Sequence, residues 1–230
     1  MTAVVRCESV CRIYQEDAYP VTALDNVSFE VHEGEFVSLA GPSGSGKSTL
    51  LNIIGGLDRP TSGDVYLGDT HLNGLDETQL SDLRLYQLGF IFQDYNLIPV
   101  LNALENVEFT MQLQGVDAKE RSERALATLQ SLGLGDLAHR RPSELSGGQQ
   151  QRVAIARAIV TRPKVLLADE PSANLDSKST EGLLELLLKL NREQGVTIIT
   201  ATHDPLVMRY ARRRVRLVDG HIDSDELSED

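Results

Sequence analysis

The chain has 230 residues, of which 41% are hydrophobic and 5% aromatic, and its net charge at neutral pH is −12. This length suits one large domain, and the acidic balance argues against a nucleic-acid partner, because phosphate backbones are bound by basic surfaces. No apolar run reaches the ~18–20 residues of a membrane span, and residues 1–7 contain no signal-peptide core. We therefore expect a location in the cytoplasm.

The first third of the chain alternates apolar and polar residues in the manner of antiparallel strands. We expect one strand at Val27–Val31 and a second at Phe36–Leu39, joined by a turn at 32–35. Helical character follows at 49–54, and a short strand is expected at 64–67. These segments predict an antiparallel β element on the N-terminal side of the molecule.

The middle of the chain changes from strand to helix. A helix at 76–88 and a short buried strand at 89–92 come first. Further along, apolar residues recur with the 3.6-residue period of helices, over 104–113, 118–132 and 147–160. We therefore expect a helical subdomain over about 94–162.

Apolar strands return in the last third, at Val165–Ala168 and Val196–Thr200, with a helix at 178–194 between them. Continuous apolar strands separated by helices are typical of a parallel sheet covered on both faces. The predicted fold is α/β, with a nucleotide-binding core into which the helical subdomain is inserted. Arg212–Arg214 are expected at a solvated helix end, and the acidic segment from Ser224 onward is expected to fray.

A phosphate-binding loop is predicted between the apolar run at 36–40 and the helix at 49–54, where the sequence fits G-x-x-x-x-G-K-[ST]. Its residues are Gly41, Pro42, Ser43, Gly44, Ser45, Gly46, Lys47, Ser48 and Thr49. Glycines allow successive backbone N–H groups to surround an anion, and the helix N-terminus adds a partial positive charge. In this motif Lys47 reaches the β- and γ-phosphates, and the Ser48 hydroxyl binds Mg²⁺.

Two adjacent carboxylates follow the buried strand at 165–168. Neighbouring residues of a strand point to opposite faces, so Asp169 and Glu170 can take different tasks. Asp169 suits the role of holding Mg²⁺, directly or through water. Glu170 is then placed to polarise an attacking water molecule as a general base.

A second anion site is predicted at the start of the helix at 150–160, where Leu145 is followed by Ser146, Gly147, Gly148 and Gln149. The two glycines leave the free N–H groups of the helix start unobstructed. One chain thus carries two helix starts suited to phosphate.

Together these motifs resemble the ATP-binding cassette of ABC transporters, a member of the P-loop NTPase class with a RecA-like core, and the resemblance covers essentially all of residues 1–230. Residues 145–149 match the signature motif of this family, and Gln93 stands where the family has its Q-loop glutamine. The resemblance implies that Gln93 contacts Mg²⁺ and the γ-phosphate, and that ATP and Mg²⁺ are the cofactors.

Three further positions take roles from the same resemblance. Residues 172–176 match the D-loop, which ends at Asp176. His203 matches the switch histidine, which holds the γ-phosphate and the attacking water. Tyr14 matches the aromatic residue that stacks on adenine, with Tyr19 as the alternative because the segment between them is hard to align.

The resemblance also narrows to a branch of the family and implies partners. Residues 51–58, 89–93 with 96–99, and 104–107 are similar to the macrolide-exporter and lipoprotein-release branch. In family members the nucleotide lies between two cassettes, so a second copy of this chain is implied. A membrane permease is implied as well, with its cytoplasmic helix in a groove near Asn96–Leu104, and this would hold the chain at the inner face of the membrane.

A soluble ABC-type ATPase that acts on a nucleic-acid or ribosome complex is the alternative function. Members of those classes insert a long coiled coil or fuse two cassettes, and neither feature occurs in this sequence.

Overall fold

The computed structural model describes residues 3–15 and 19–227, and its centre is a six-stranded sheet in the order β10-β9-β3-β8-β7-β6. Five of these strands are parallel, and β10 pairs antiparallel with β9 at one edge. The strands are β3 (Phe36–Ala40), β6 (Leu88–Ile91), β7 (Val165–Asp169), β8 (Thr197–Thr202), β9 (Arg213–Val218) and β10 (His221–Leu227). The predicted α/β class is confirmed.

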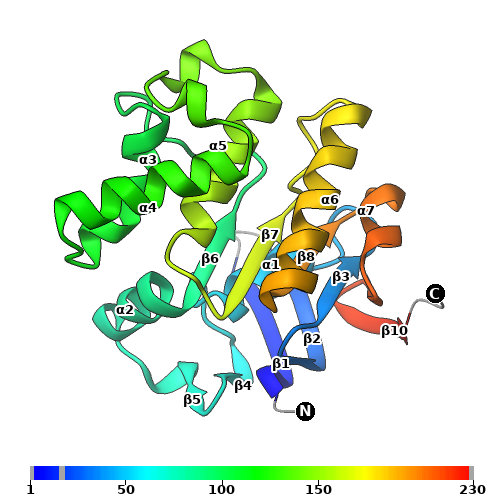
Figure 1. The fold of residues 1–230 in the computed structure, drawn as a ribbon. Coiled ribbons are helices and arrows are strands. Elements are labelled where there is room, and N and C mark those ends of the chain that lie inside the picture. The colour runs from blue at the N-terminus through cyan, green and yellow to red at the C-terminus, as the bar shows by residue number, and fades with distance from the viewer. Residues whose placement is uncertain (1–2, 16–18, 228–230) are drawn as a thin grey trace.

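Helices cover both faces of this sheet (Figure 1). All five residues of β3 are buried, and alternate ones enter two different cores. Val37 and Leu39 pack with α1 (Lys47–Ile54), whereas Phe36 packs with α5 (Gly147–Ile159) and α6 (Ser177–Gln194). The short helix α7 (Pro205–Tyr210) follows β8.

A second, antiparallel sheet has the order β2-β1-β4-β5 and shares a core with α1. Its strands are β1 (Ala3–Gln15), β2 (Pro20–His32), β4 (Ser62–Leu67) and β5 (Thr70–His71). The expected β element is therefore present, but the expected pairing of the first two strands is wrong. β2 pairs with β1, and β3 leaves for the parallel sheet. The burial pattern explains this, because β2 alternates between buried and exposed residues while β3 is buried on both faces.

Helices α3 (Ala103–Leu113), α4 (Ala118–Ser131) and α5 form a lobe beyond β6, drawn in green in Figure 1. Helix α2 (Glu77–Gln87) lies between this lobe and the small sheet. Asn102 and Glu105 form a capping box at the start of α3, and Asp117 caps α4. In the described part of the chain, none of the helices is long and apolar enough to cross a bilayer.

The C-terminal segment differs from the prediction. Residues 221–227 form β10, so the acidic end is paired up to Leu227 instead of frayed, and residues 228–230 lie outside the described part. Arg212–Arg214 do not end a helix, since Arg213 begins β9. Arg213 forms ion pairs with Asp225 of β10 at 2.6 Å and with Glu35 at 3.0 Å. Cross-strand charge pairing therefore explains why this acidic segment is ordered.

Candidate functional site

The predicted phosphate-binding loop connects β3 to α1, and its backbone is shaped to leave N–H groups free. Gly46 is the N-cap of α1 with a φ of 100°, and within residues 3–15 and 19–227 no side chain caps this helix start. A Cβ atom at Gly46 would lie 2.4 Å from the Ala23 carbonyl oxygen of β2, so only glycine fits between loop and strand. The first-turn N–H groups therefore remain available to an anion.

Lys47 lies at the base of this loop and is only 6% exposed. Its Nζ donates hydrogen bonds of 2.9 Å to the carbonyl oxygens of Gly41 and Pro42. The ammonium is thus held inside the curve of the loop, close to the free N–H groups. A concentrated positive potential results, which suits a phosphate group.

Ser48 and Asp169 meet at the carboxyl ends of the parallel strands. The Ser48 hydroxyl donates a 2.9 Å hydrogen bond to Oδ1 of Asp169, which ends β7. Burial raises the pKa of Asp169, and the neighbouring Glu170 raises it further, while the Ser48 hydrogen bond and the Lys47 charge act in the opposite direction. A partly buried carboxylate that is costly to ionise gains from a cation beside it, and a hydroxyl with a carboxylate oxygen is a ligand pair that Mg²⁺ prefers.

Glu170 and His203 form a close pair at the neighbouring strand ends. Nδ1 of His203 lies 2.7 Å from Oε1 of Glu170, and the two side chains are 68% and 15% exposed, respectively. Thr202 donates a longer hydrogen bond of 3.4 Å to the second carboxylate oxygen. Glu170 has a φ of 45°, a strained backbone conformation for a residue other than glycine, and such strain is concentrated at functional sites.

Lys47, Ser48, Glu170 and His203 line one cavity of about 660 Å³, and Asp169 is linked to it through Ser48. It brings together Lys47 and Ser48 from the loop, Gln93 from the segment after β6, and Glu170 and His203 from the ends of β7 and β8. Pro42, Ser43, Gly44, Gly46 and Thr49 complete its loop side. Most of the predicted site residues therefore converge, although they come from four separate segments of the sequence.

The signature motif lies elsewhere in the chain. Ser146 caps α5 through a capping box, in which its Oγ accepts from the Gln149 N–H at 3.4 Å and Gln149 Oε1 accepts from the Ser146 N–H at 2.9 Å. Asp176 caps the neighbouring helix α6 and bonds Ser179. Among the residues that the structure describes, neither the signature residues 146–149 nor Asp176 lines the loop cavity, although Ala173 of the D-loop does.

Tyr14 is anchored more firmly than Tyr19. Its hydroxyl donates a 2.7 Å hydrogen bond to Asp58, and the guanidinium of Arg12 lies over its ring, 4.4 Å from the centroid. Arg12 also binds Asp58 at 2.8 Å. Tyr19, by contrast, is 79% exposed, and residues 16–18 lie outside the described part. Tyr14 is therefore the more firmly held ring, although neither tyrosine is among the described residues that line the loop cavity. The register partner of Tyr14 is Val21 of β2, the strand whose Ala23 carbonyl lies beside the loop.

A separate apolar groove of about 550 Å³ runs between α2, α3, β6 and the end of α5. Its apolar residues include Leu57, Leu85, Phe90, Phe92, Ile98, Phe109 and Leu113. Of the segment predicted to form this groove, only Asn96 and Ile98 line it, whereas Val100 is 73% exposed outside it. The sequence prediction missed α2 and α3 as its walls, because their apolar residues become neighbours only in the folded chain.

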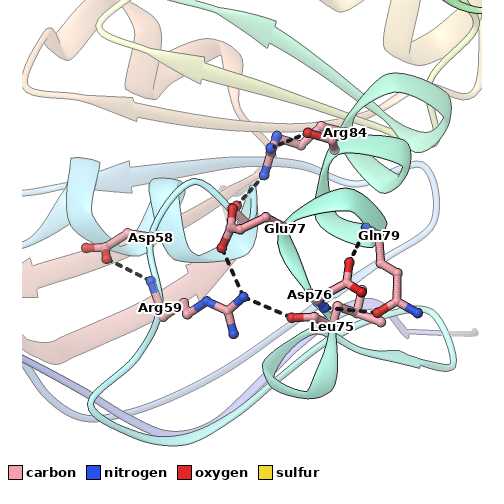
Figure 2. Close-up of polar contacts among 9 residues, drawn as sticks. Asp58, Arg59, Leu75, Asp76, Glu77, Gln79 and Arg84 are labelled. Atoms are coloured by element: carbon pink, nitrogen blue, oxygen red, sulfur yellow. Dashed lines mark hydrogen bonds and ion pairs between the residues drawn. The ribbon is translucent and has the colours of Figure 1, made fainter.

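The loop between α1 and β4 is fixed to α2 by the polar contacts in Figure 2. Nη2 of Arg59 donates to the Leu75 carbonyl at 2.9 Å and to Glu77 at 3.0 Å. Asp76 and Gln79 form the capping box that begins α2. Nη1 of Arg84 donates to the Gly56 carbonyl at 2.6 Å. These contacts hold one wall of the groove against the helix that follows the phosphate-binding loop.

Comparison with known proteins gives consistent matches over the whole molecule. Residues 24–173 match the family model described as ABC transporter. The chain is 46% identical over 227 residues to the uncharacterized ABC transporter ATP-binding protein MJ0796 of Methanocaldococcus jannaschii, which covers 97% of each chain. It is 50% identical over 226 residues to an uncharacterized ABC transporter ATP-binding protein of Thermotoga maritima, covering 98% of this chain and 96% of that one. It is also 45% identical over 219 residues to the uncharacterized ABC transporter ATP-binding protein YknY of Bacillus subtilis, covering 95% of each.

Two solved structures of MJ0796 superpose on this chain with a TM-score of 0.91 at 46% sequence identity, covering 97% of this chain and 98% of the other. One is described as a dimeric post-hydrolysis state bound to ADP and Pi, and the second as the dimeric structure of a bacterial ABC transporter cassette.

Proposed function

The chain belongs to the ABC transporter family, and from this membership we propose that it is the subunit that binds and hydrolyses ATP to drive a membrane transporter. Residues 1–230 act as one ATP-binding cassette, with the helical subdomain at about 94–162 inserted into the α/β core. Within the family, the segments at 51–58, 89–93 and 104–107 favour the macrolide-exporter and lipoprotein-release branch. ATP and Mg²⁺ are its cofactors.

The observation that carries this proposal is the convergence of Lys47, Ser48 and the Glu170–His203 pair on one cavity, with Asp169 hydrogen-bonded to Ser48. The residues fit a magnesium nucleotide. The uncapped start of α1 offers N–H donors to phosphate, and Ser48 with Asp169 offers oxygen ligands to Mg²⁺. Bound Mg²⁺ would neutralise part of the phosphate charge.

Each protein group has a defined task in this proposal. Lys47 exchanges its bonds to the loop carbonyls for contacts to the β- and γ-phosphates. Gln93 contributes from the segment after β6. Glu170 accepts a proton from the attacking water, and His203 orients the Glu170 carboxylate through its 2.7 Å contact while facing the γ-phosphate.

A second copy of the chain completes the site. The signature residues Ser146, Gly147, Gly148 and Gln149, and Asp176 of the D-loop, lie outside the loop cavity of their own chain, so we propose that they face the cavity of a partner copy. The solved structures of MJ0796 described as dimeric support this arrangement. Closing two chains around ATP brings the free N–H groups of α5 to the γ-phosphate.

The apolar groove is the proposed docking site for the cytoplasmic helix of a permease. Leu57 and Leu113 are 47% and 57% exposed there, and an amphipathic helix would bury them. This contact would hold the chain at the inner face of the membrane. A nucleic-acid partner is not proposed, because the net charge is −12.

Two variants test the catalytic assignment in opposite ways. Glu170→Gln keeps the size and an acceptor oxygen of the side chain but removes the base, so ATP should still bind while turnover falls by about 10²–10⁴-fold. Lys47→Ala should lose nucleotide binding. Gel filtration with Mg-ATP should therefore show a dimer for Glu170→Gln and a monomer for Lys47→Ala. Near-normal ATPase activity of Glu170→Gln would move the base role to another group.

A further inference from the structure

The segment after β6 has an unusual backbone. Tyr95 and Asn96 are consecutive residues with positive φ angles of 58° and 49°, although neither is glycine. Left-handed backbone at such residues costs free energy and persists only where the surroundings impose it. The segment begins at Gln93, which lines the nucleotide cavity, and Asn96 lines the apolar groove. Something must therefore hold this short connection between the two sites.

One restraint comes from α5. Arg157 donates through Nη2 to the Tyr95 carbonyl at 3.0 Å and through Nη1 to the Asn96 carbonyl. Burial lowers the pKa of Arg157. Within the described residues Arg157 forms no ion pair, so the two carbonyls are the acceptors that its guanidinium has. The guanidinium thus fixes the two strained residues from the helix that begins at the signature motif.

The second restraint comes from Asn174 in the loop between β7 and α6. Its Nδ2 donates to the Gln93 carbonyl at 3.0 Å and to Oδ1 of Asp94 at 3.3 Å, and its own carbonyl accepts from the Tyr95 hydroxyl at 3.4 Å. A Cβ atom at Gly147 would lie 2.8 Å from the Tyr95 hydroxyl, so the start of α5 reaches the same cluster. Asn174 therefore contacts three consecutive residues of the segment, from Gln93 to the strained Tyr95.

We propose that Asn174 is a positioning residue that fixes the backbone of Gln93, and that it thereby transmits the state of the nucleotide cavity to the groove. The inference rests on the proposed function of that cavity. Asn174 is exposed in the single chain, so its hydrogen bonds add little to stability. Its effect is on the position of Gln93, where a misplacement of about 1 Å can cost up to 10²-fold in rate.

The test compares Asn174→Ala with Asn174→Asp. The aspartate has the same shape as asparagine but lacks both N–H donors. Its negative charge would also repel the carboxylate of Asp94. Both variants should keep the KM for ATP within about 2-fold and lower kcat, by about 10-fold in Asn174→Ala and by more in Asn174→Asp. If the residue only filled space, Asn174→Asp would be the milder change, and that result would overturn the proposal.

Hydrogen exchange of the intact chain gives a second readout. With Mg²⁺ and a non-hydrolysable ATP analogue, the wild type should be protected in peptides covering 41–50 and 92–99. In the Asn174 variants protection should remain at 41–50 and be lost at 92–99. Protection at both peptides in Asn174→Asp would refute the inference, as would loss at both.

Asn73→Ala is the matched control. Its amide likewise holds a loop, through Nδ2 to the Gly63 carbonyl at 2.8 Å, but Asn73 lines neither the nucleotide cavity nor the groove. It should leave exchange at 92–99 unchanged.

Failure of the proposed function can be distinguished from failure of this inference, because the wild-type loop peptide 41–50 would then show no protection by nucleotide. Faster exchange at 92–99 in the nucleotide-free Asn174 variants would still be expected, and its absence would count against the inference.

Discussion

Tyr14 is the ring proposed to stack on adenine, and two neighbouring side chains fix its orientation. Arg12 lies over its ring, and Asp58 accepts a hydrogen bond from its hydroxyl, so the ring is oriented before any nucleotide arrives. A ring fixed in advance loses little entropy on stacking with a base.

Tyr14→Ala should accordingly weaken ATP binding by about 1–3 kcal/mol, with a similar effect on ADP because adenine is common to both. Tyr14→Phe keeps the stacking ring and should retain most of the affinity. Titration calorimetry with Mg-ATP measures both. An unchanged affinity of Tyr14→Ala, together with a loss in Tyr19→Ala, would move the adenine platform to Tyr19.

Residues of the site were predictable where their motif is continuous in sequence. In the loop at 41–49 and in the pair Asp169–Glu170, the functional residues are adjacent in the sequence. Asn174 and Gln93 are 81 residues apart, and Tyr14 and Asp58 are 44 apart, so their contacts arise only when sheets and loops are placed in space. Thr202, which donates a hydrogen bond to Glu170, was not predicted as a site residue. Its place directly before His203, at the end of a strand, is the one local signal that could have identified it.

At the scale of whole elements, the edge strand β10 depends on one residue of its neighbour. The Arg213 guanidinium makes two contacts to Asp225, at 2.7 and 2.6 Å, and a further one to the Glu30 carbonyl at 2.8 Å. Its ion pair with Glu35 ties this corner to the turn before β3. One side chain therefore joins both sheets.

Arg213→Ala should lower the free energy of unfolding by about 2–3 kcal/mol, because it leaves partly buried acceptors without their partner. Arg212→Ala changes the exposed neighbour and should stay within about 0.5 kcal/mol of the wild type. Urea denaturation followed by circular dichroism compares the two. Equal midpoints would show that β10 does not need this cluster.

Local patterns predicted most elements but not their partners. Helical patterns located α2 to α6 to within a residue or two, because helical periodicity depends on neighbours in sequence. Sheet membership depends on strands that are distant in sequence, and so β3 was wrongly paired with β2. The order of β10 was missed for the same reason, since its acidic residues are stabilised by arginines on another strand.

At the scale of the whole molecule, the groove is the surface through which the proposed ATPase would act on a membrane partner. Leu113→Glu places a charge among its apolar residues and should lower the partner-stimulated ATPase by on the order of 10-fold, since a buried charge without a counter-ion costs several kcal/mol. Val100→Glu alters an exposed apolar residue outside the groove and serves as the control. Co-purification from solubilised membranes should fail for Leu113→Glu alone. Retention of the partner by this variant would place the docking surface elsewhere.

The separation of Ser146 from the loop cavity of its own chain has a genetic consequence. Ser146→Arg would inactivate the site formed with the partner's phosphate-binding loop, whereas Lys47→Ala would inactivate the site at the chain's own loop. Each variant alone should therefore be inactive. In a mixed pair both defects fall on the same composite site, and the other site is built from unaltered halves. Co-expression of the two inactive alleles should therefore restore ATPase activity through mixed dimers. Mixed dimers can be isolated with two different affinity tags. If they remain inactive, either each chain works alone or both sites must be intact for ATP hydrolysis.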